Sequence, residues 1–178
     1  AKSPRWAIAF KYPSQQASTE VEEAVYSIGR TGTITPVIKV KPVFCGGVTI
    51  RNVSVHNFAE VERLDIGIGD KILIERAGEV IPKVIKVVDR KGRRKALAPP
   101  KTCHSCGEPV SKDPEFVAFY CDNPSCPAQL KRTLLHFASR GAMDIQGLGE
   151  AIVDQLVDSG RVKDIADIYA LGKEDFLN

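Results

Sequence analysis

The order of apolar and polar positions divides the chain into a β-type first half and an α-type end. Short runs rich in β-branched residues occupy 21–28, 34–43, 48–55, 71–74 and 80–88. Glycine and aspartate separate these runs, which is typical of strands joined by turns. The pattern therefore predicts five strands between about residues 20 and 88.

Between the third and fourth runs, residues 57–64 have the spacing of one short helix, with Asn57 placed to cap its first NH groups. Five short strands with a single helix between the third and fourth is the order of an oligonucleotide-binding (OB-fold) barrel. A small SH3-like barrel is the alternative architecture.

After residue 127 the apolar period becomes helical. Leucine and phenylalanine recur at spacings of three and four within 128–140, and a second stretch covers 152–157 before Gly160. A Gly-Leu-Gly turn at 147–149 joins them, and glycines in such a turn allow close approach to a phosphate. Glu150 directly after the turn would repel a phosphate, so packing between modules is the other interpretation of this hairpin.

Four of the five cysteines have the spacing of a metal site. Cys103 and Cys106 form a C-x2-C knuckle, and after fourteen residues Cys121 and Cys126 form C-x4-C. Four thiolates close a tetrahedral shell, so the pattern predicts a structural Zn²⁺ and not a catalytic one. Disulfides are the alternative, but the sequence starts without a signal-peptide pattern and cytosolic thiols stay reduced. Isolated Cys45 is expected to be a small, half-buried apolar residue at a strand end.

The overall composition is ordinary, but the distribution of charge along the chain is uneven. The 178 residues are 43% hydrophobic and 26% charged, and no apolar run approaches the roughly 18 residues of a membrane span, so a soluble protein without a membrane partner is expected. The net charge is only +3, but residues 82–101 hold eight bases and one acid, whereas 144–178 hold eight acids and three bases. A solvated basic loop and a nucleic-acid surface both fit the first segment.

Ordered motifs along the chain resemble bacterial NAD-dependent DNA ligases. Residues 6–13, WAIAFKYP, resemble the last motif of that family's nucleotidyltransferase domain. Residues 29–37, 55–57 and 76–82 resemble signature stretches of its OB-fold barrel. The cysteine knuckles and the Met-Asp-Ile-x-Gly-Leu-Gly hairpin at 143–149 follow in the family's order, so the resemblance covers essentially the whole chain.

The resemblance implies a multidomain β plus α chain: a five-stranded OB-fold barrel, a four-cysteine zinc finger and a small helical hairpin region. The expected boundaries are the end of the nucleotidyltransferase (adenylation) domain at 1–15, the OB-fold at 16–98, the zinc finger at 99–127 and the beginning of a helix-hairpin-helix domain at 128–178.

The activity implied by the resemblance is the sealing of nicks. A lysine takes AMP from NAD, the AMP passes to a 5′-phosphate, and the 3′-hydroxyl displaces it. Lys11 matches the lysine that the family places against the adenylate phosphate, so it is the candidate catalytic and cofactor-binding residue. The family's nucleophile lies in a Lys-x-Asp-Gly motif, which is absent from this sequence. We therefore expect an internal fragment that is inactive alone, with NAD and Mg²⁺ serving the parent enzyme.

DNA contacts are expected from two turns. Arg30 and Thr31, in a Gly-flanked turn, suit a backbone phosphate, the arginine as a forked donor and the threonine as a neutral one. Arg76 is similarly placed before a second turn. The resemblance puts Val80 and Ile81 at the minor-groove surface, although strand alternation lets only one of them face inward.

The expected partners are nicked duplex DNA and the remaining ligase domains, in a monomeric enzyme of replication and repair at the bacterial nucleoid in the cytoplasm. Another hypothesis is a non-catalytic single-strand-binding module, which requires exposed aromatic residues and here has mainly Tyr26, Phe44 and Phe58. A purely structural zinc ribbon is a third, but it would leave Lys11 and the Arg30 turn without purpose.

Overall fold

The computed structural model describes residues 6–8, 14–76, 82–90, 92, 94–113 and 117–176. They form two compact units. The first, called the sheet unit, takes the residues up to Val25, Val37–His56 and Glu60–Leu97. The second, called the cysteine unit, takes Tyr26–Pro36, Asn57–Ala59 and the residues from Ala98 onward.

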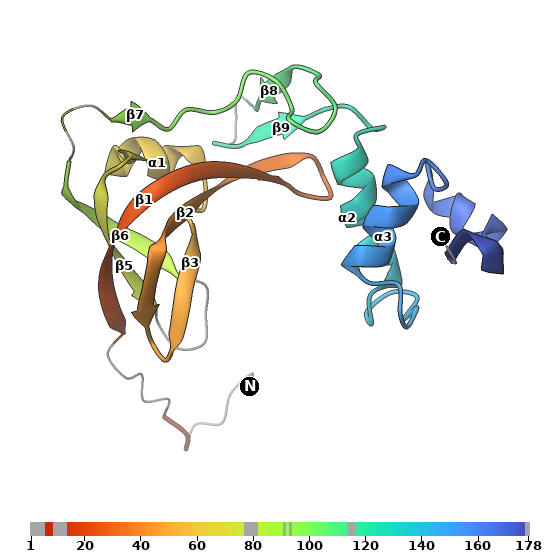
Figure 1. Cartoon of the computed structure of the whole chain (residues 1–178), viewed down its shortest axis with the longest axis horizontal. Coiled ribbons are helices and arrows are strands. Elements are labelled where there is room, and N and C mark those ends of the chain that lie inside the picture. Colours follow the sequence, from red (N-terminus) through yellow and green to blue (C-terminus); the bar gives the residue numbers. More distant parts are fainter. Residues whose placement is uncertain are drawn as a thin grey trace. The chain divides into compact units, whose positions relative to one another are not determined.

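Seven strands form one mixed sheet (Figure 1). Its strands are β1 (Gln15–Ile28), β2 (Thr33–Cys45), β3 (Val48–Ser54), β5 (Lys71–Arg76), β6 (Lys83–Asp89), β8 (Val110–Lys112) and β9 (Phe119–Cys121). The order is β1-β5-β6-β3-β2-β9-β8, with an additional β1–β2 pairing. Helix α1 (Phe58–Leu64) follows β3, and the short strands β4 (Gly67–Ile68) and β7 (Lys95–Ala96) pair separately.

The predicted element order of an OB-fold is confirmed, with β1, β2, β3, β5 and β6 as its five strands and α1 between the third and fourth. The five strands follow one another in the order β1-β5-β6-β3-β2, and β2 pairs back to β1, but the barrel is not fully closed. Among the described residues, β3 and β6 pair in parallel at one position only, Ser54 with Lys83. Strand β9 also pairs with β2, so the sheet extends beyond the five strands.

The core of the sheet unit follows from strand alternation. In β2 the side chains of Ile38 and Val40 are buried, and in β5 those of Ile72 and Ile74, because residues two apart share one face. Cys45 is buried in the same core, at the end of β2. The buried members of the cluster are Val21, Ile38, Val40, Cys45, Ile50, Val53, Val55, Val61, Ile66, Ile72, Ile74 and Val84.

Strands β1 and β2 are much longer than the five or six residues usual for a strand, at 14 and 13 residues. Their outer ends, residues 26–28 and 33–36, belong to the cysteine unit. The hairpin that they form is therefore shared between two cores. Contiguous sequence blocks do not describe this packing, and the boundaries at 15, 98 and 127 stay predictions.

Helices α2 (Pro127–Ala138) and α3 (Glu150–Asp158) lie where the helical period predicts them (Figure 1). Pro127 occupies the first turn of α2, where its missing NH costs no hydrogen bond. The two helices share a buried cluster of Leu134, Val153, Leu156 and Val162. Two 3-10 helices follow, η1 (Ile165–Ala170) and η2 (Lys173–Phe176).

An ion-pair bridge adds to the α2–α3 packing. The ammonium of Lys131 lies 3.0 Å from a carboxylate oxygen of Asp154 and 2.8 Å from one of Asp158. Within the described residues, no helix is both long and apolar enough to span a membrane.

Candidate metal centre and nucleic-acid interface

The four cysteines of the predicted site come together. Their sulfur atoms all lie within 4.8 Å of one another, with Cys103 and Cys126 at 3.9 Å and Cys106 and Cys121 at 3.5 Å. A tetrahedral zinc with bonds of about 2.3 Å to sulfur separates its ligands by about 3.8 Å. A disulfide would need about 2.0 Å. The five cysteines, all within the described residues, are free thiols, so the donor set fits a metal ion.

Each knuckle is shaped by its own backbone. In the first, the NH of Gly107 donates to the Cys103 carbonyl at 2.8 Å, and Gly107 has the positive φ of 79° that favours glycine. In the second, the NH of Cys126 donates to the Asn123 carbonyl at 3.1 Å. Cys126 is also the N-cap of α2, so the second knuckle leads directly into that helix.

The thiols differ in acidity. Burial raises the pKa of Cys121 to about 12 and also raises the pKa of Cys103. Burial acts in the same sense on Cys106, but hydrogen bonds from the Glu108 backbone and the Asn123 side chain outweigh it, and the pKa of Cys106 falls to about 7. Because a metal binds thiolates, its uptake must displace protons from the less acidic members of the set.

Arg30 and Thr31 lie at the exposed tip of the β1–β2 hairpin, as predicted from their Gly-flanked position. The turn is tight. The NH of Gly29 donates to the Thr33 carbonyl at 2.8 Å, and the NH of Gly32 donates to the Gly29 carbonyl at 3.0 Å. The hydroxyls of Thr31 and Thr33 are 3.1 Å apart. Both candidate side chains are thus presented to solvent by a defined backbone.

This turn is attached to the second cysteine knuckle. The NH of Cys121 donates to the Gly32 carbonyl at 3.0 Å, and β2 pairs with β9 at Thr33–Tyr120 and Ile34–Phe119. The two backbones are so close that a Cβ on Gly32 would lie 2.3 Å from the Cys121 carbonyl oxygen. The predicted phosphate-binding turn therefore belongs structurally to the cysteine unit.

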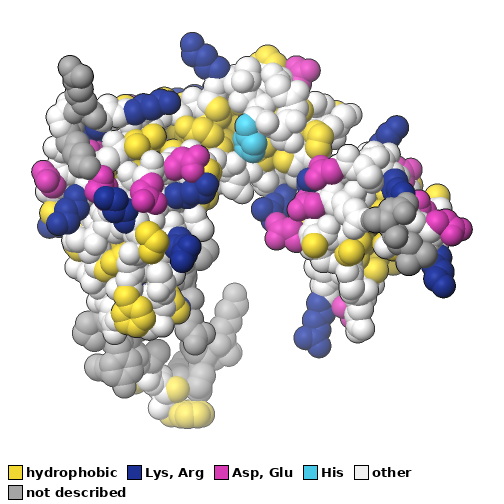
Figure 2. Space-filling view, viewed as in Figure 1, with side chains coloured by type: hydrophobic (Ala, Val, Ile, Leu, Met, Phe, Trp, Pro, Cys, Tyr) yellow, Lys and Arg dark blue, Asp and Glu magenta, His cyan; other side chains and the backbone are white. Residues whose placement is uncertain are grey.

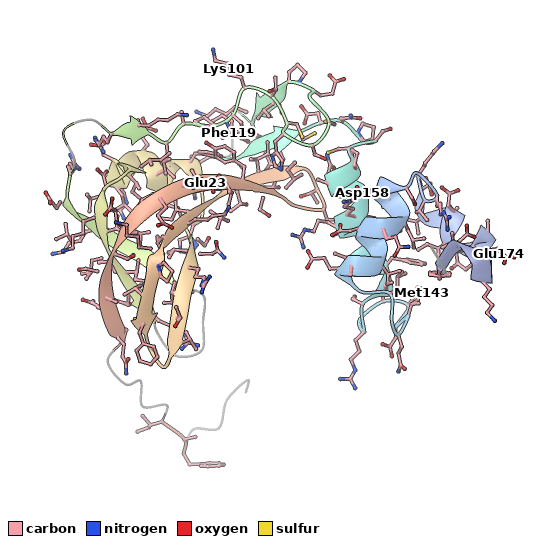
Figure 3. The ribbon with its side chains drawn as sticks, viewed as in Figure 1. Glu23, Lys101, Phe119, Met143, Asp158 and Glu174 are labelled. Atoms are coloured by element: carbon pink, nitrogen blue, oxygen red, sulfur yellow. The ribbon has the colours of Figure 1, made fainter. Side chains whose placement is uncertain are left out.

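One core lies beneath both features. Ile28, Ile34 and Phe58 are buried with Cys103, Cys121 and Cys126. Phe119 on β9, labelled in Figure 3, meets the ring of Phe58 edge-on with centroids 5.0 Å apart. The flanks of the Arg30 turn and three of the four clustered cysteines consequently share their packing.

The aromatic side chains considered for base stacking do not form a platform. Tyr26 packs against the core around Phe58, and its hydroxyl donates to the Ala98 carbonyl at 2.8 Å. Phe58 is only 6% exposed. Of the three aromatic residues considered for stacking, Phe44 alone is well exposed, at 71%. Of the three residues named for base stacking, a single exposed ring is little support for a single-strand-binding surface.

The remaining predicted contacts belong to the sheet unit or lie outside the described residues. Arg76 ends β5, and its Nη1 donates to the Gly46 carbonyl in the β2–β3 turn. One guanidinium nitrogen is thus engaged within the protein, and a phosphate contact by Arg76 stays a prediction. Lys11, Val80 and Ile81 lie outside the described residues.

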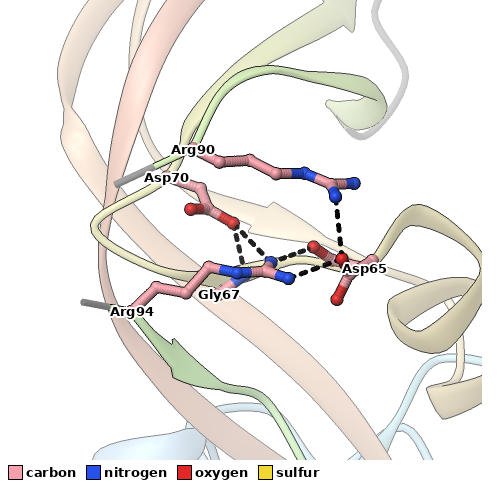
Figure 4. A network of polar contacts seen from close by, with 5 residues as sticks. All are labelled: Asp65, Gly67, Asp70, Arg90 and Arg94. Carbon is pink, nitrogen blue, oxygen red and sulfur yellow. Dashed lines mark hydrogen bonds and ion pairs between the residues drawn. The ribbon is translucent and has the colours of Figure 1, made fainter. Parts of the chain in front are cut away.

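Part of the basic segment at 82–101 is neutralised internally (Figure 4). Arg94 lies 3.1 Å from a carboxylate oxygen of Asp70 and 2.5 Å from one of Asp65, and Arg90 lies 2.9 Å from Asp65. Asp70 is fully buried, and the same oxygen accepts from the Gly67 NH at 2.8 Å. These arginines hold the turn before β5, a role that the charge count along the sequence missed.

The face of the sheet unit seen in Figure 2 carries basic and acidic side chains side by side. Lys39 pairs with Glu23 at 2.8 Å and Lys41 with Glu20 at 2.9 Å, across β1 and β2. As far as its described residues go, this face offers no continuous basic stripe.

Comparison with known proteins shows which proteins this chain is similar to. Residues 18–96 match the NAD-dependent DNA ligase OB-fold domain. A DNA ligase of Methylacidiphilum infernorum is 52% identical over 180 residues, which is 100% of this chain and 26% of the relative. DNA ligases of Geobacter sulfurreducens and Endomicrobium trichonymphae are each 50% identical, over 99% of this chain and 27% and 26% of their own lengths.

This chain belongs to the NAD-dependent DNA ligase family. The resemblance carried by the ordered motifs is confirmed, and the chain spans about a quarter of the length of the ligases that it matches. In this ligase chain the family's OB-fold supplies β1 to β7, and the matched region includes the Arg30 turn and Arg76.

The arginine network gives the ligase chain a specific pH dependence. Hydrogen bonding to Arg94 holds the pKa of Asp65 below its usual value. Because the folded pKa lies below the unfolded one, ionised Asp65 stabilises the fold above the unfolded pKa of about 3.9, and this contribution is lost as the pH falls through the lower folded pKa.

We expect Arg94→Gln to remove that contribution. Melting temperatures followed by circular dichroism should differ from wild type at neutral pH, and the difference should shrink below about pH 4. Lys95→Gln, an exposed neighbour, serves as the control and should melt like wild type at each pH. An Arg94→Gln deficit that persists undiminished into acid would contradict the role assigned to Asp65.

Proposed function

We propose that this chain is the duplex-gripping portion of a DNA ligase that uses NAD to seal nicks, joining a 5′-phosphate to a 3′-hydroxyl in replication and repair. The observation that carries the proposal is the exposed Arg30–Thr31 turn, fixed on a cysteine-clustered unit within a chain of the ligase family. A rigidly held donor pair is what recognition of a backbone phosphate requires.

Arg30 donates to a phosphate oxygen through its guanidinium, and Thr31 through its hydroxyl. Arg76, from the sheet unit, contributes a second phosphate contact with the nitrogens not bonded to Gly46. Val80 and Ile81 provide apolar contact in the minor groove, where such side chains widen the groove and favour bent DNA. Phosphate contacts hold the duplex in register without reading its sequence, which suits an enzyme that must act at any nick.

Zinc is the proposed occupant of the cysteine site, held by Cys103, Cys106, Cys121 and Cys126. Sulfur separations of 3.5 and 3.9 Å support a tetrahedral shell of four thiolates. Such an ion organises the fold, and four protein ligands leave no coordination position for substrate. The residues around it therefore bind and orient DNA, and the chemistry takes place elsewhere in the enzyme.

The catalytic steps are assigned to the whole enzyme. Lys11 is proposed to place its ammonium against the adenylate phosphate, where it offsets developing negative charge. The nucleophilic lysine of the family's Lys-x-Asp-Gly motif is not among these 178 residues, so this stretch alone should neither react with NAD nor seal nicks. NAD and Mg²⁺ act in the intact ligase, which we propose to be a monomer in the bacterial cytoplasm, associated with the nucleoid.

The domain plan proposed for the chain follows the family: the end of the adenylation domain at 1–15, the OB-fold at 16–98, the zinc finger at 99–127 and the start of the helix-hairpin-helix domain from 128. Glu150 at the start of α3 lies 3.7 Å from Arg132, which offsets its negative charge. Phosphate contact by this hairpin remains compatible with its charges, although it is secondary to the Arg30 turn.

Arg30→Ala tests the proposed contact with a duplex phosphate. We expect weaker binding to a nicked duplex at unchanged melting temperature, because the side chain is exposed. The slope of log affinity against log salt should become shallower by about one unit, as one phosphate contact is lost. Fluorescence anisotropy at several salt concentrations measures both quantities.

Arg51→Ala is the matched control, since Arg51 is an exposed arginine on β3 outside the proposed turn. It should leave the salt slope unchanged. Equal slopes for wild type and Arg30→Ala, or equal losses for the two variants, would contradict a specific phosphate contact at Arg30.

A further inference from the structure

The peptide of Cys121 is held from two sides. Its NH donates to the carbonyl of Gly32 in the Arg30 turn, at 3.0 Å, and its carbonyl accepts from the side-chain amide of Gln129 on α2, at 2.7 Å. The same Gln129 nitrogen also donates to the Asn123 carbonyl, at 3.1 Å. Cys121 thereby joins the cysteine cluster, the Arg30–Thr31 turn and helix α2.

The Arg30 turn and the second cysteine knuckle are too close for a side chain at Gly32. A Cβ on Gly32 would lie 2.3 Å from the Cys121 carbonyl oxygen and 3.1 Å from the Gln129 amide nitrogen. Gly32 also has a φ of 80°, which side chains other than glycine rarely adopt. A displacement of Cys121 would therefore disturb its hydrogen bond to Gly32, which is only two residues from Arg30.

The packing around this contact depends on the cysteines. Ile28 and Ile34, on the strands that flank the turn, are 4% and 2% exposed and lie in one cluster with Cys103, Cys121 and Cys126. An ion that binds the four thiolates fixes the centre of that cluster. Loss of the ion would remove that fixed centre, and we expect the packing that supports the flanks of the turn to weaken with it.

We propose that the metal site positions the Arg30–Thr31 turn, so that metal binding and duplex binding are thermodynamically linked, with Gly32 and Gln129 as the positioning residues that transmit the linkage. The inference rests on the proposed function for its DNA side. By reciprocity, a metal ion that favours duplex binding must itself be held more tightly when the duplex is bound.

Hydrogen exchange tests the coupling without DNA. In the metal-loaded chain the amides of Gly32 and Cys121 are hydrogen-bonded and should be protected. Stripping the metal with a chelator should abolish protection at both amides, while the paired strands β5 and β6 keep theirs. If the two amides remain protected after metal loss, the coupling is wrong, whatever the chain does with DNA.

Gly32→Ala tests the contact itself, and Gly47→Ala is its control. Both glycines have similar positive φ, 80° and 83°, but a Cβ on Gly47 would meet nothing within 4 Å. Backbone strain is thus matched, and only the clash with Cys121 differs. Gly32→Ala should weaken zinc retention against a chromophoric chelator and weaken nicked-duplex binding, whereas Gly47→Ala should change neither. Equal behaviour of the two variants would overturn the proposal.

Gln129→Leu removes the amide donors without adding a clash, and it keeps the proposal testable if Gly32→Ala fails to fold. It too should weaken both zinc retention and duplex binding. If Gln129→Leu keeps both zinc retention and duplex binding, or loses zinc retention alone, the positioning role assigned to Gln129 is wrong.

Reciprocity gives the last test. Saturating nicked duplex should lower the apparent dissociation constant of zinc from the wild-type chain by about fivefold or more, the usual scale of coupling between sites. The effect should vanish in Gln129→Leu. An unchanged zinc affinity in a chain that does bind duplex would overturn the linkage. A metal-loaded chain that binds no duplex would instead refute the proposed function, and the exchange experiment would still decide the coupling.

Discussion

Removal of the metal, by a chelator or by Cys103→Ser, is expected to unfold the part of the cysteine unit around the four cysteines and leave the sheet unit folded. Structural zinc contributes on the order of 10 kcal/mol to the folding of small zinc domains, as much as the entire stability of many proteins. The buried cluster around Ile28, Ile34 and Phe58 includes three of the cysteines and, among the described residues, no other fully buried members. The sheet unit has its own buried core, which includes none of the four metal ligands.

Amide resonances provide the measurement. Those of residues 26–36 and 98–126 should lose dispersion after metal removal, and those of β3, β5 and β6 should remain in place. Cys45→Ser is the control, because Cys45 is a buried thiol of the other core and its replacement should leave metal binding intact. A well-dispersed spectrum for both units in the metal-free chain would contradict a folding role for the ion.

Ile72→Ala is expected to have the converse effect, with destabilisation of the sheet unit by about 2 to 5 kcal/mol. Ile72 is fully buried on β5, so its truncation leaves a cavity as well as lost apolar contact. Urea unfolding followed by circular dichroism measures the change. The metal content should stay as in wild type, because none of the metal ligands belongs to this core.

Val88→Ala, on neighbouring β6, is the matched control, since Val88 is 51% exposed. It should cost much less than the buried truncation. A loss below about 1 kcal/mol for Ile72→Ala would contradict the core assignment, as would loss of bound metal in that variant. Metal removal tests whether the cysteine unit depends on the ion, and Ile72→Ala tests whether the sheet unit depends on its apolar core.

Local patterns in the sequence were sufficient for the five OB-fold strands, the helices α1 to α3 and the clustering of four cysteines, but not for β4, β7, β8 and β9. Alternation of β-branched residues predicted the strands, the leucine period predicted α2, and the spacing of Cys103, Cys106, Cys121 and Cys126 predicted their convergence. Each of these features is encoded over a few turns or strand lengths, because side-chain periodicity reflects local geometry.

What the sequence did not reveal depends on pairing between distant segments. The run at 21–28 predicts a strand, but not that its end leaves the first core for the cysteines. Nor does the sequence show that Gln129 supports the Arg30 turn, since that contact passes through the backbone of Cys121. The positive count at 82–101 likewise hides the ion pairs of Arg94 with Asp65 and Asp70. An acid directly after a glycine turn, Asp70, was the available signal.

The proposed function requires that this chain binds interrupted double helices. Competition binding of the metal-loaded chain between a nicked duplex and a single strand of equal length tests it most directly. We predict tighter binding to the nicked duplex, with an affinity that falls steeply as salt is raised. Preference for the single strand, or no measurable binding to the nicked duplex at low salt, would contradict the account.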